Sequence, residues 1–362
     1  MKENQRLLHL DYLRGFIIFL VVVFHVSITF MARVPQWWYV KSSDSSMLFT
    51  LPVIILDTFM MPVLFFIGGH VLIFSMRKNS MSQLTAKRFK RLGIPWVVCT
   101  LLFSPWLSLL TARETGNNTS YIKMVTHGFW TEYYSQGPYW FLGILLSFTL
   151  LLLLFKFIAG NRQASKMIPT GVIQFSLFFI SFAGYTAGSF FYGVDTWVNP
   201  LYIWSFQPSR ILTYLTFFIA GHLLSEKEWK SNPGIVRWAV TALISAAGFT
   251  VMKGKTDVSA GFAAYAVQGL FYSGLAVSTS LFLSGFFAKK CTGPSSIPSF
   301  MSRHSFMVYL VHLPILTLIA QHIAAIKTSI FPRWFLLLAA VLMLSVSISM
   351  AVNFVNGKLR AG

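Results

Sequence analysis

The sequence predicts an all-α membrane protein in which about ten helices cross the bilayer. Hydrophobic residues make up 55% of the 362 residues and charged residues only 11%, whereas about a quarter of the residues in a soluble domain are charged. Apolar runs long enough to cross a bilayer follow one another along the whole chain. The Lys and Arg residues fall mostly in alternate connections between these runs. Together these three observations indicate a polytopic membrane protein.

Each apolar run is bounded by charged residues, Gly or Pro, and is expected to form one transmembrane helix. The expected helices begin near Leu13, Leu51, Gly93, Gly137, Gly171, Pro208, Gly234, Ser259, Arg303 and Phe331. No internal repeat, low-complexity tract or linker divides them. Residues 1–362 are therefore expected to form a single membrane-embedded domain.

The chain is strongly basic, with a formal net charge of +19 at pH 7. Such a charge could indicate a nucleic-acid partner, but an excess of Lys and Arg on the cytoplasmic side also orients membrane helices. If the N-terminus is cytoplasmic, most of the 29 Lys and Arg residues lie in inner connections and tails. We therefore expect both termini in the cytoplasm and no nucleic-acid partner. The first apolar run lacks a convincing cleavage site and is expected to remain as a signal anchor.

The first expected helix carries two ionisable residues, Arg14 at its start and His25 in its interior. Ionisable groups are costly inside a bilayer, so they usually mark a functional site. Eleven residues correspond to about three helical turns, which places both side chains on one helix face about 16 Å apart. A long charged ligand could contact both.

A basic cluster, residues 87–91, precedes the third expected helix. Arg88 and Arg91 are three residues apart, so on a helical turn they share a face, and two guanidinium groups side by side suit a phosphate or diphosphate group. The alternative is a cluster that only orients the helix and contacts anionic lipid headgroups.

The ninth expected helix carries Ser305, Tyr309 and His312 at positions i, i+4 and i+7. This spacing predicts one polar stripe that faces other helices rather than lipid. His312 is expected about 13 Å from the cytoplasmic end of its helix, close to the depth of His25. Alternatively, the stripe only holds helices together by hydrogen bonds. Pro314 is expected to free a backbone carbonyl and to kink this helix.

Two further charged residues lie within expected helices. Asp57 in the second helix is a candidate partner for a cation, because an isolated carboxylate is costly at that depth. Arg210 opens the sixth helix and is expected to snorkel to the membrane interface.

Taken together, these motifs resemble the acyltransferase 3 family of membrane proteins, whose signature is an arginine followed, after ten residues, by a histidine. The matching segments are Leu10-Asp11-Tyr12-Leu13-Arg14-Gly15 with His25, residues 61–69, Arg88 and Arg91 with Ile94-Pro95, residues 139–142, residues 217–221, and residues 305–314. They extend over nearly the whole chain in the order of the family.

The resemblance implies ten transmembrane helices and transfer of an acyl group, usually acetyl and sometimes succinyl, from cytoplasmic acyl-CoA to a glycan, lipid or antibiotic. We accordingly expect a multi-pass enzyme of the bacterial inner membrane that modifies a polysaccharide by O-acetylation. Its expected partners are acyl-CoA as co-substrate, most often acetyl-CoA, a glycan or glycolipid acceptor, and membrane lipid. No metal is expected.

The resemblance also implies a role for each candidate residue. The phosphates of acyl-CoA are assigned to Arg14, Arg88 and Arg91. His25 is expected to act as general base on the acceptor hydroxyl, because imidazole titrates near physiological pH. His312 and Tyr309 are expected to orient the acceptor or to donate to the thioester oxygen.

The chain departs from the family pattern in two places. Gly68 stands where many relatives have serine. The last expected helix, residues 331–354, has no acidic residue, whereas some relatives carry a glutamate there. Asp57 or Asp11 is the expected substitute for that carboxylate, and Ser305 is expected to support the site.

A second hypothesis is a transporter or exporter that moves an anionic or glycan solute through a cavity containing His25, Asp57 and His312. Ionisable residues inside membranes also serve proton relays and substrate pathways. An acylated acceptor with release of CoA would indicate the enzyme, and flux of an unmodified solute would indicate the transporter.

Overall fold

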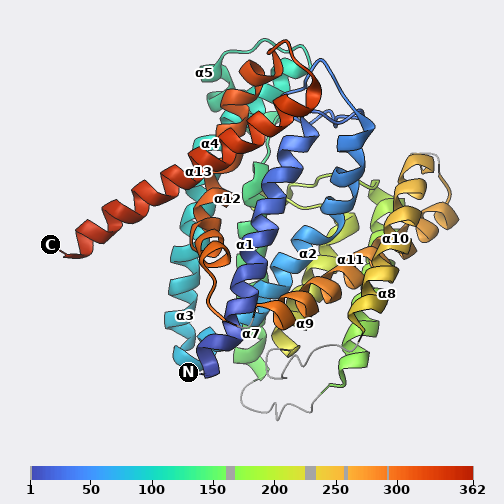
Figure 1. The fold of residues 1–362 in the computed structure, drawn as a ribbon, viewed down its shortest axis with the longest axis vertical. Helices are drawn as coiled ribbons and strands as arrows, with labels where there is room; N and C mark the ends of the chain where they lie inside the picture. The colour runs from blue at the N-terminus through green and yellow to red at the C-terminus, as the bar shows by residue number, and fades with distance from the viewer. Residues whose placement is uncertain (1, 160–167, 225–233, 257–259, 292, 362) are drawn as a thin grey trace. The chain divides into compact units, whose positions relative to one another are not determined.

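The computed structural model describes residues 2–159, 168–224, 234–256, 260–291 and 293–361 (Figure 1). Within these ranges the chain is helical with short connections, and extended backbone pairs only at two isolated bridges, Met31 with Ser46 and Val198 with Phe206. The predicted all-α class is confirmed.

Nine helices of the described part of the chain are long and apolar enough to cross a membrane. They are α1 (Lys2–Ile28), α2 (Met47–Lys78), the continuous segment α3 (Met81–Arg88), η1 (Phe89–Gly93) and α4 (Ile94–Glu114), then η3 (Gly137–Tyr139) with α7 (Trp140–Ala159), α8 (Thr170–Tyr192), α10 (Ile235–Lys255), α11 (Phe262–Lys290), α12 (Ser296–Ala324) and α13 (Ile330–Ala361). The sixth expected helix is α9 (Pro208–Leu224), which ends where the described range ends. The fold is thus an all-α polytopic membrane protein, as predicted.

The helix boundaries differ from the expected ones mainly because polar residues extend the helices beyond their apolar cores. For example, α1 begins at Lys2 and α12 at Ser296, each several residues before the apolar run. The expected start at Ser259 lies outside the described residues, as do four basic residues used to predict the orientation. These four are Arg162, Lys166, Lys227 and Lys230.

The helices group into two compact units that alternate along the chain. Unit 1 contains Met1–Asp57, Val98–Tyr139 and Gly293–Gly362, and unit 2 contains Thr58–Val97 and Trp140–Thr292. The single domain expected for residues 1–362 stays a prediction.

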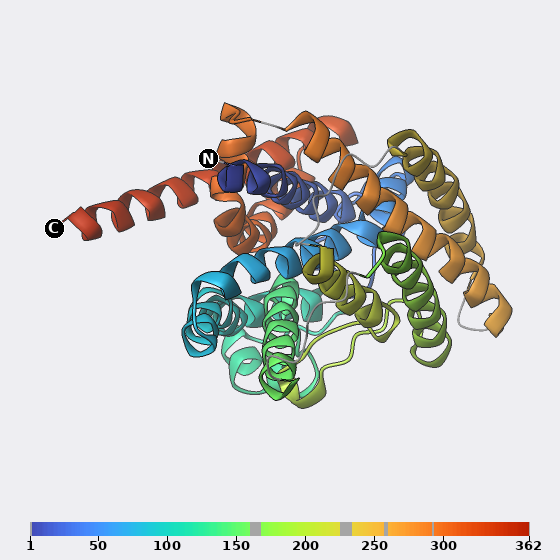
Figure 2. The same cartoon turned by 90° about the horizontal axis from the view of Figure 1, so that it is seen from below.

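In unit 1, α1 packs against both α12 and α13, which also pack against each other (Figures 1 and 2). The connection that follows α4 folds back in three short helices, α5 (Tyr121–Lys123), η2 (Met124–Gly128) and α6 (Phe129–Thr131). Met124 and Phe129 from this segment are fully buried against Leu109 and Ala112 of α4. Burial of these apolar side chains holds the connection on its helix.

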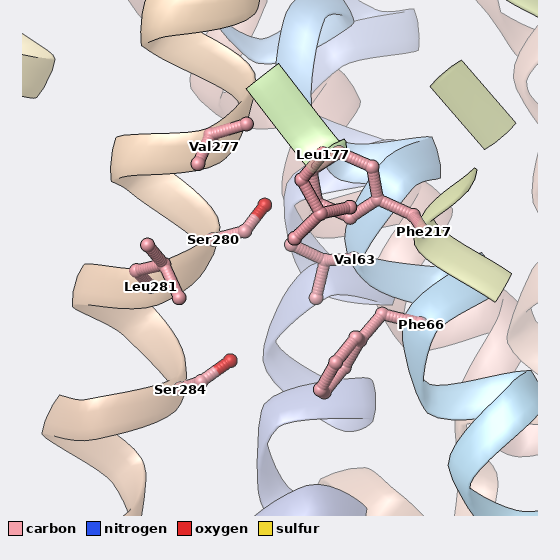
Figure 3. Close-up of a pocket in the computed structure, with 8 residues that line it drawn as sticks. All are labelled: Val63, Phe66, Leu177, Phe217, Val277, Ser280, Leu281 and Ser284. Carbon is pink, nitrogen blue, oxygen red and sulfur yellow. The ribbon is translucent and has the colours of Figure 1, made fainter. Parts of the chain in front are cut away.

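In unit 2, α8 packs against α9 and α11, and α10 packs against α11. The apolar core of this unit includes Leu177 of α8, Phe217 of α9 and Leu281 of α11. A small pocket lies beside this core, with Ser280 and Ser284 of α11 among its lining residues (Figure 3). Its volume of about 10 Å³ leaves room for about one water molecule, so it is too small for a substrate.

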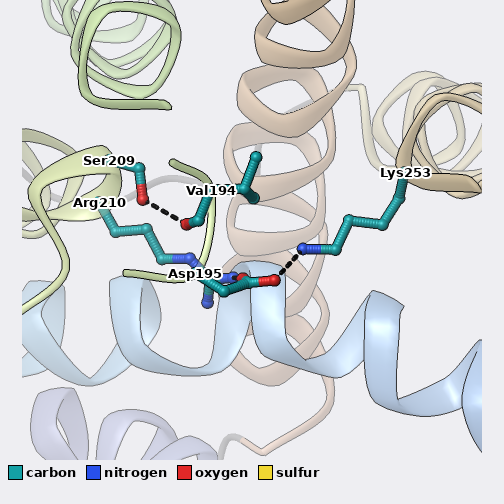
Figure 4. A network of polar contacts seen from close by, with 5 residues as sticks. All are labelled: Val194, Asp195, Ser209, Arg210 and Lys253. Atoms are coloured by element: carbon teal, nitrogen blue, oxygen red, sulfur yellow. Dashed lines mark hydrogen bonds and ion pairs between the residues drawn. The ribbon is translucent and has the colours of Figure 1, made fainter. Parts of the chain in front are cut away.

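Arg210 does not snorkel to the interface, so that expectation is wrong. Its side chain is only 4% exposed and its Nη2 lies 3.1 Å from Asp195, which also accepts a 2.6 Å hydrogen bond from Lys253 (Figure 4). Burial by itself raises the pKa of Asp195, but the two cations outweigh this effect and hold the pKa below its ordinary value. The ion pairs, together with the bond from Ser209 to the Val194 carbonyl, fix the connection between α8 and α9.

Two glycines allow α2 and α9 to approach at backbone distance. A Cβ atom at Gly69 would overlap the Phe218 carbonyl oxygen, and one at Gly221 would overlap the Phe66 carbonyl oxygen. The neighbouring Gly68 faces Leu145, so a serine side chain there would also meet this leucine. Backbone contact of this kind requires residues without a side chain.

We expect Gly69→Ala and Gly221→Ala each to destabilise the protein by about 1–3 kcal/mol, because the added methyl group overpacks a contact made by backbone. Gly254→Ala is the matched control, since a Cβ there meets open space. Thermal unfolding in detergent should show a lower Tm for the first two variants only. An unchanged Tm for both would contradict the close approach of α2 and α9.

Candidate active site

The candidate site of unit 1 is built on α1 and α12, which run in the same direction. Near one end, a Cβ atom at Gly15 would lie 2.9 Å from the Ser302 nitrogen, so the two backbones are close together there. About three turns further along both helices, His25 meets His312. The missing side chain at position 15 therefore sets the distance between the two helices that carry the site.

Arg14 is held at this close approach. Its Nη2 lies 3.1 Å from Asp11 and donates a 3.1 Å hydrogen bond to the Ser302 hydroxyl. The side chain is 30% exposed, so the guanidinium remains partly accessible. Asp11 thus pairs with Arg14 and is not hydrogen-bonded to His25 or His312. Ser302 was missed in the sequence because no motif distinguishes it from other helix serines.

Ser305 lies one turn further along α12. Its hydroxyl donates a 2.8 Å hydrogen bond to the Ser302 carbonyl, and the residue is buried. The side chain thus bonds within its own helix, next to the residue that binds Arg14.

The two imidazoles form a hydrogen-bonded pair. His312 Nε2 lies 3.1 Å from His25 Nδ1, and His312 Nδ1 lies 2.8 Å from the Tyr309 carbonyl oxygen and 3.1 Å from that of Val308. A carbonyl only accepts, so His312 carries its proton on Nδ1 and presents a lone pair at Nε2. His25 must then donate from Nδ1, which leaves the lone pair of its Nε2 for another partner.

The accessibility of the two rings differs in a way that suits this arrangement. His312 is completely buried, whereas His25 is only partly buried. His312 therefore orients the ring of His25, and His25 is the imidazole that a substrate could reach.

Pro314 fixes the position of α12 through the carbonyl that it frees. Proline has no N–H, so the Leu310 carbonyl has no partner within the helix, and it accepts a 3.0 Å hydrogen bond from the Tyr139 hydroxyl. In return, the Tyr309 hydroxyl donates to the Pro138 carbonyl. The helix continues through Pro314, from Ser296 to Ala324. These reciprocal bonds attach α12 to η3 and hold the turn that carries His312.

An aromatic residue missed in the sequence completes the site. Trp38 lies in the connection after α1 and is fully buried. Its indole ring is stacked on the imidazole ring of His25, with an angle of 6° between the ring planes and 5.7 Å between the ring centroids. Its Nε1 donates to Thr29. The run Trp37-Trp38-Tyr39 in a short connection was the available signal, although aromatic residues at membrane interfaces are common. The neighbouring Tyr39 is also buried, which raises the pKa of its hydroxyl and keeps it neutral.

Within the described residues, no carboxylate is hydrogen-bonded to His25 or His312, whose polar contacts are with each other and with backbone carbonyls. Asp57 lies partly buried in α2. No group of three or more His, Cys, Asp or Glu that could hold a metal ion occurs in the part of the chain that the structure describes.

Arg88 and Arg91 belong to unit 2. Ser80 caps α3 in a capping box with Gln83, and the helix ends at Arg88, whose Nη2 donates a 3.3 Å hydrogen bond to Ser75. From Phe89 to Gly93 the backbone is a π-helix. A π-helix has more residues per turn than an α-helix, so the rotation about the helix axis per residue is smaller. Arg88 and Arg91 are therefore farther apart around the helix axis than expected. Arg88 is partly buried and Arg91 is exposed.

A comparison with protein families identifies the family of the chain. The model of the Acyltransferase domain family matches residues 7–352, nearly the whole chain. The chain belongs to this family. It is a membrane acyltransferase, and the family resemblance predicted from its motifs is confirmed. Comparisons with curated proteins and with solved structures return no match.

For this acyltransferase we expect His312→Ala to lower kcat about 100-fold with little change in KM, because the ring of His25 loses the partner that sets its tautomer and orientation. His304→Ala is the matched control, because His304 is a buried imidazole on the same helix that contacts Ser349 instead. Steady-state kinetics in membranes checks this prediction. Equal losses in the two variants would show a general effect of removing a buried imidazole.

Proposed function

We propose that this acyltransferase transfers an acetyl group from acetyl-CoA to a hydroxyl group of a glycan or glycolipid, with succinyl as the alternative acyl group. The observation that carries this proposal is the His25–His312 pair, which leaves one imidazole nitrogen of a partly buried ring ready to accept a proton. Transfer of an acyl group to a hydroxyl needs such a base.

In the proposed reaction, His25 Nε2 takes the proton of the acceptor hydroxyl while the hydroxyl oxygen attacks the thioester carbon. The new C–O bond forms as the C–S bond breaks, and the departing thiolate receives the proton from the imidazolium of His25. His312 holds the ring of His25 throughout. The Tyr309 hydroxyl donates to the Pro138 carbonyl. We therefore propose that Tyr309 positions the turn that carries His312, instead of contacting the acceptor or the thioester oxygen directly.

The arginines proposed to bind the phosphates of acyl-CoA occur in both units. In unit 1, Arg14 is partly accessible and lies about 16 Å along α1 from His25, a distance that suits an extended pantetheine arm. In unit 2, Arg88 and Arg91 lie where α3 continues as a π-helix, a feature that often occurs at functional sites. Guanidinium groups bind phosphate in a bidentate manner, which supports all three assignments.

The distribution of basic residues supports both termini in the cytoplasm, which would place Arg14 at the cytoplasmic end of α1. Acyl-CoA would then enter from the cytoplasm, and the end of α1 after His25 would face the opposite side. We therefore propose that the enzyme lies in the bacterial inner membrane and modifies a polysaccharide or glycolipid by O-acetylation. Asp57 remains a proposed supporting residue.

We expect His25→Ala to lower acyl transfer by about 10²–10⁴-fold, because the acceptor hydroxyl loses its base. The measurement uses membranes supplied with radiolabelled acetyl-CoA or succinyl-CoA, followed by mass spectrometry of glycans and glycolipids from cells with and without the protein. The mass increment identifies the acyl group. Full transfer by His25→Ala would refute this role.

For the donor site we expect Arg88→Ala combined with Arg91→Ala to raise the KM for acyl-CoA about tenfold or more, with a smaller effect on kcat, because charge-assisted contacts to phosphate are lost. Arg113→Ala combined with Lys123→Ala, which also removes two cations from exposed positions of unit 1, controls for the change in net charge. An unchanged KM in the double variant would leave the two arginines a role in membrane orientation only.

A further inference from the structure

The proposed reaction places a positive charge on His25, and no carboxylate of the described part of the chain is hydrogen-bonded to it. In enzymes that use histidine as a base, an aspartate commonly stabilises the imidazolium that forms. Here, the polar partners of the His25 side chain among the described residues are His312 and the backbone carbonyl of Val21, and neither is a carboxylate. His312 in turn donates to backbone carbonyls. The stabilising group must therefore be of another kind.

Trp38 has the geometry for this task. The faces of the indole and imidazole rings are nearly parallel, 6° apart, with centroids 5.7 Å apart. A cation over an indole face within about 6 Å of its centroid is attracted by the negative charge of that face, and the attraction is larger when water is excluded. Trp38 is 0% exposed, so water is excluded on its side of the pair.

We propose that Trp38 is a positioning residue of the transfer reaction, which stabilises the imidazolium of His25 through the face of its indole ring. This inference rests on the proposed function, because it requires that His25 takes a proton. The other rings beside His25 are not parallel to it: Phe24 lies at a centroid distance of 5.0 Å with ring planes inclined by 74°, and His312 at 5.0 Å with planes inclined by 39°. Tyr39 contacts Trp38 and Tyr309 contacts His312, so Trp38 is the aromatic face aligned with the ring of His25.

The connection that carries Trp38 is anchored firmly enough to hold this stack. Backbone bonds join Ser42 to Thr29 and Ser46 to Phe30. Asp44 forms an ion pair with the buried Arg333 of α13. These contacts hold the second half of the connection beside the end of α1 and on α13 of the same unit, and the bond from Trp38 Nε1 to Thr29 orients the indole ring itself.

The test compares substitutions at position 38 in the full-length protein in membranes. We expect kcat to fall from tryptophan to Trp38→Phe and further to Trp38→Leu, by about tenfold or more for leucine, with the KM for acyl-CoA within about twofold of wild type. The matched control is Trp37→Leu, because Trp37 is the adjacent indole and is 39% exposed. This variant should keep the wild-type kcat.

Site-specific fluorotryptophans at position 38 separate the electrostatic effect from a purely structural one. Fluorine withdraws electron density from the indole face and hardly changes its size, so log kcat should fall steadily with each added fluorine. If log kcat does not change with the number of fluorine atoms, the inference is overturned, even if the leucine variant does not fold. If the series is flat while His25→Ala abolishes transfer, only this inference fails; if the wild-type protein transfers no acyl group, the proposed function fails first.

Discussion

The close backbone approach of α1 and α12 is the constraint on which the rest of the site depends. Gly15 allows it, because any side chain at that position would collide with the backbone at Ser302. Two parallel helices that touch at this point remain in register over the next three turns, which brings His25 within hydrogen-bond distance of His312. Arg14 then closes the contact by binding the Ser302 hydroxyl. One missing side chain thus positions charged and titratable groups along a shared interface.

Backbone carbonyls bind the imidazole pair at the position where other histidine sites use a carboxylate. A carboxylate within a bilayer is costly, whereas a carbonyl carries a dipole without a net charge. The carbonyl of Tyr309 fixes the tautomer of His312, and through it that of His25. The carbonyl released by Pro314 anchors the same helix to Tyr139. The absence of an acidic residue in the last helix is therefore compatible with an oriented imidazole pair.

The fold was predictable because a bilayer restricts the chain so strongly. Each apolar run must form a helix that satisfies its own backbone hydrogen bonds, so length and hydrophobicity nearly suffice to find the helices. In the site, the polar stripe of α12 and the shared depth of the two histidines were also predicted, because helical periodicity determines which residues share a face. The spacing of Arg88 and Arg91 was predicted less well, since nothing in the sequence indicated a π-helix at Phe89.

The sequence by itself determined the membrane class, the approximate helices, the family and the principal ionisable residues. These properties follow from local hydrophobicity and periodicity, which each segment carries independently of the others. Only the tertiary structure decided that Asp11 pairs with Arg14, that the Tyr309 hydroxyl binds Pro138, and that Trp38 stacks on His25. Each of these contacts requires one side chain to meet a specific atom or ring of another residue. Two of the three connect different segments of the chain, α12 with η3 and α1 with the connection that follows it. Their geometry depends on how helices and connections pack, which no single segment specifies.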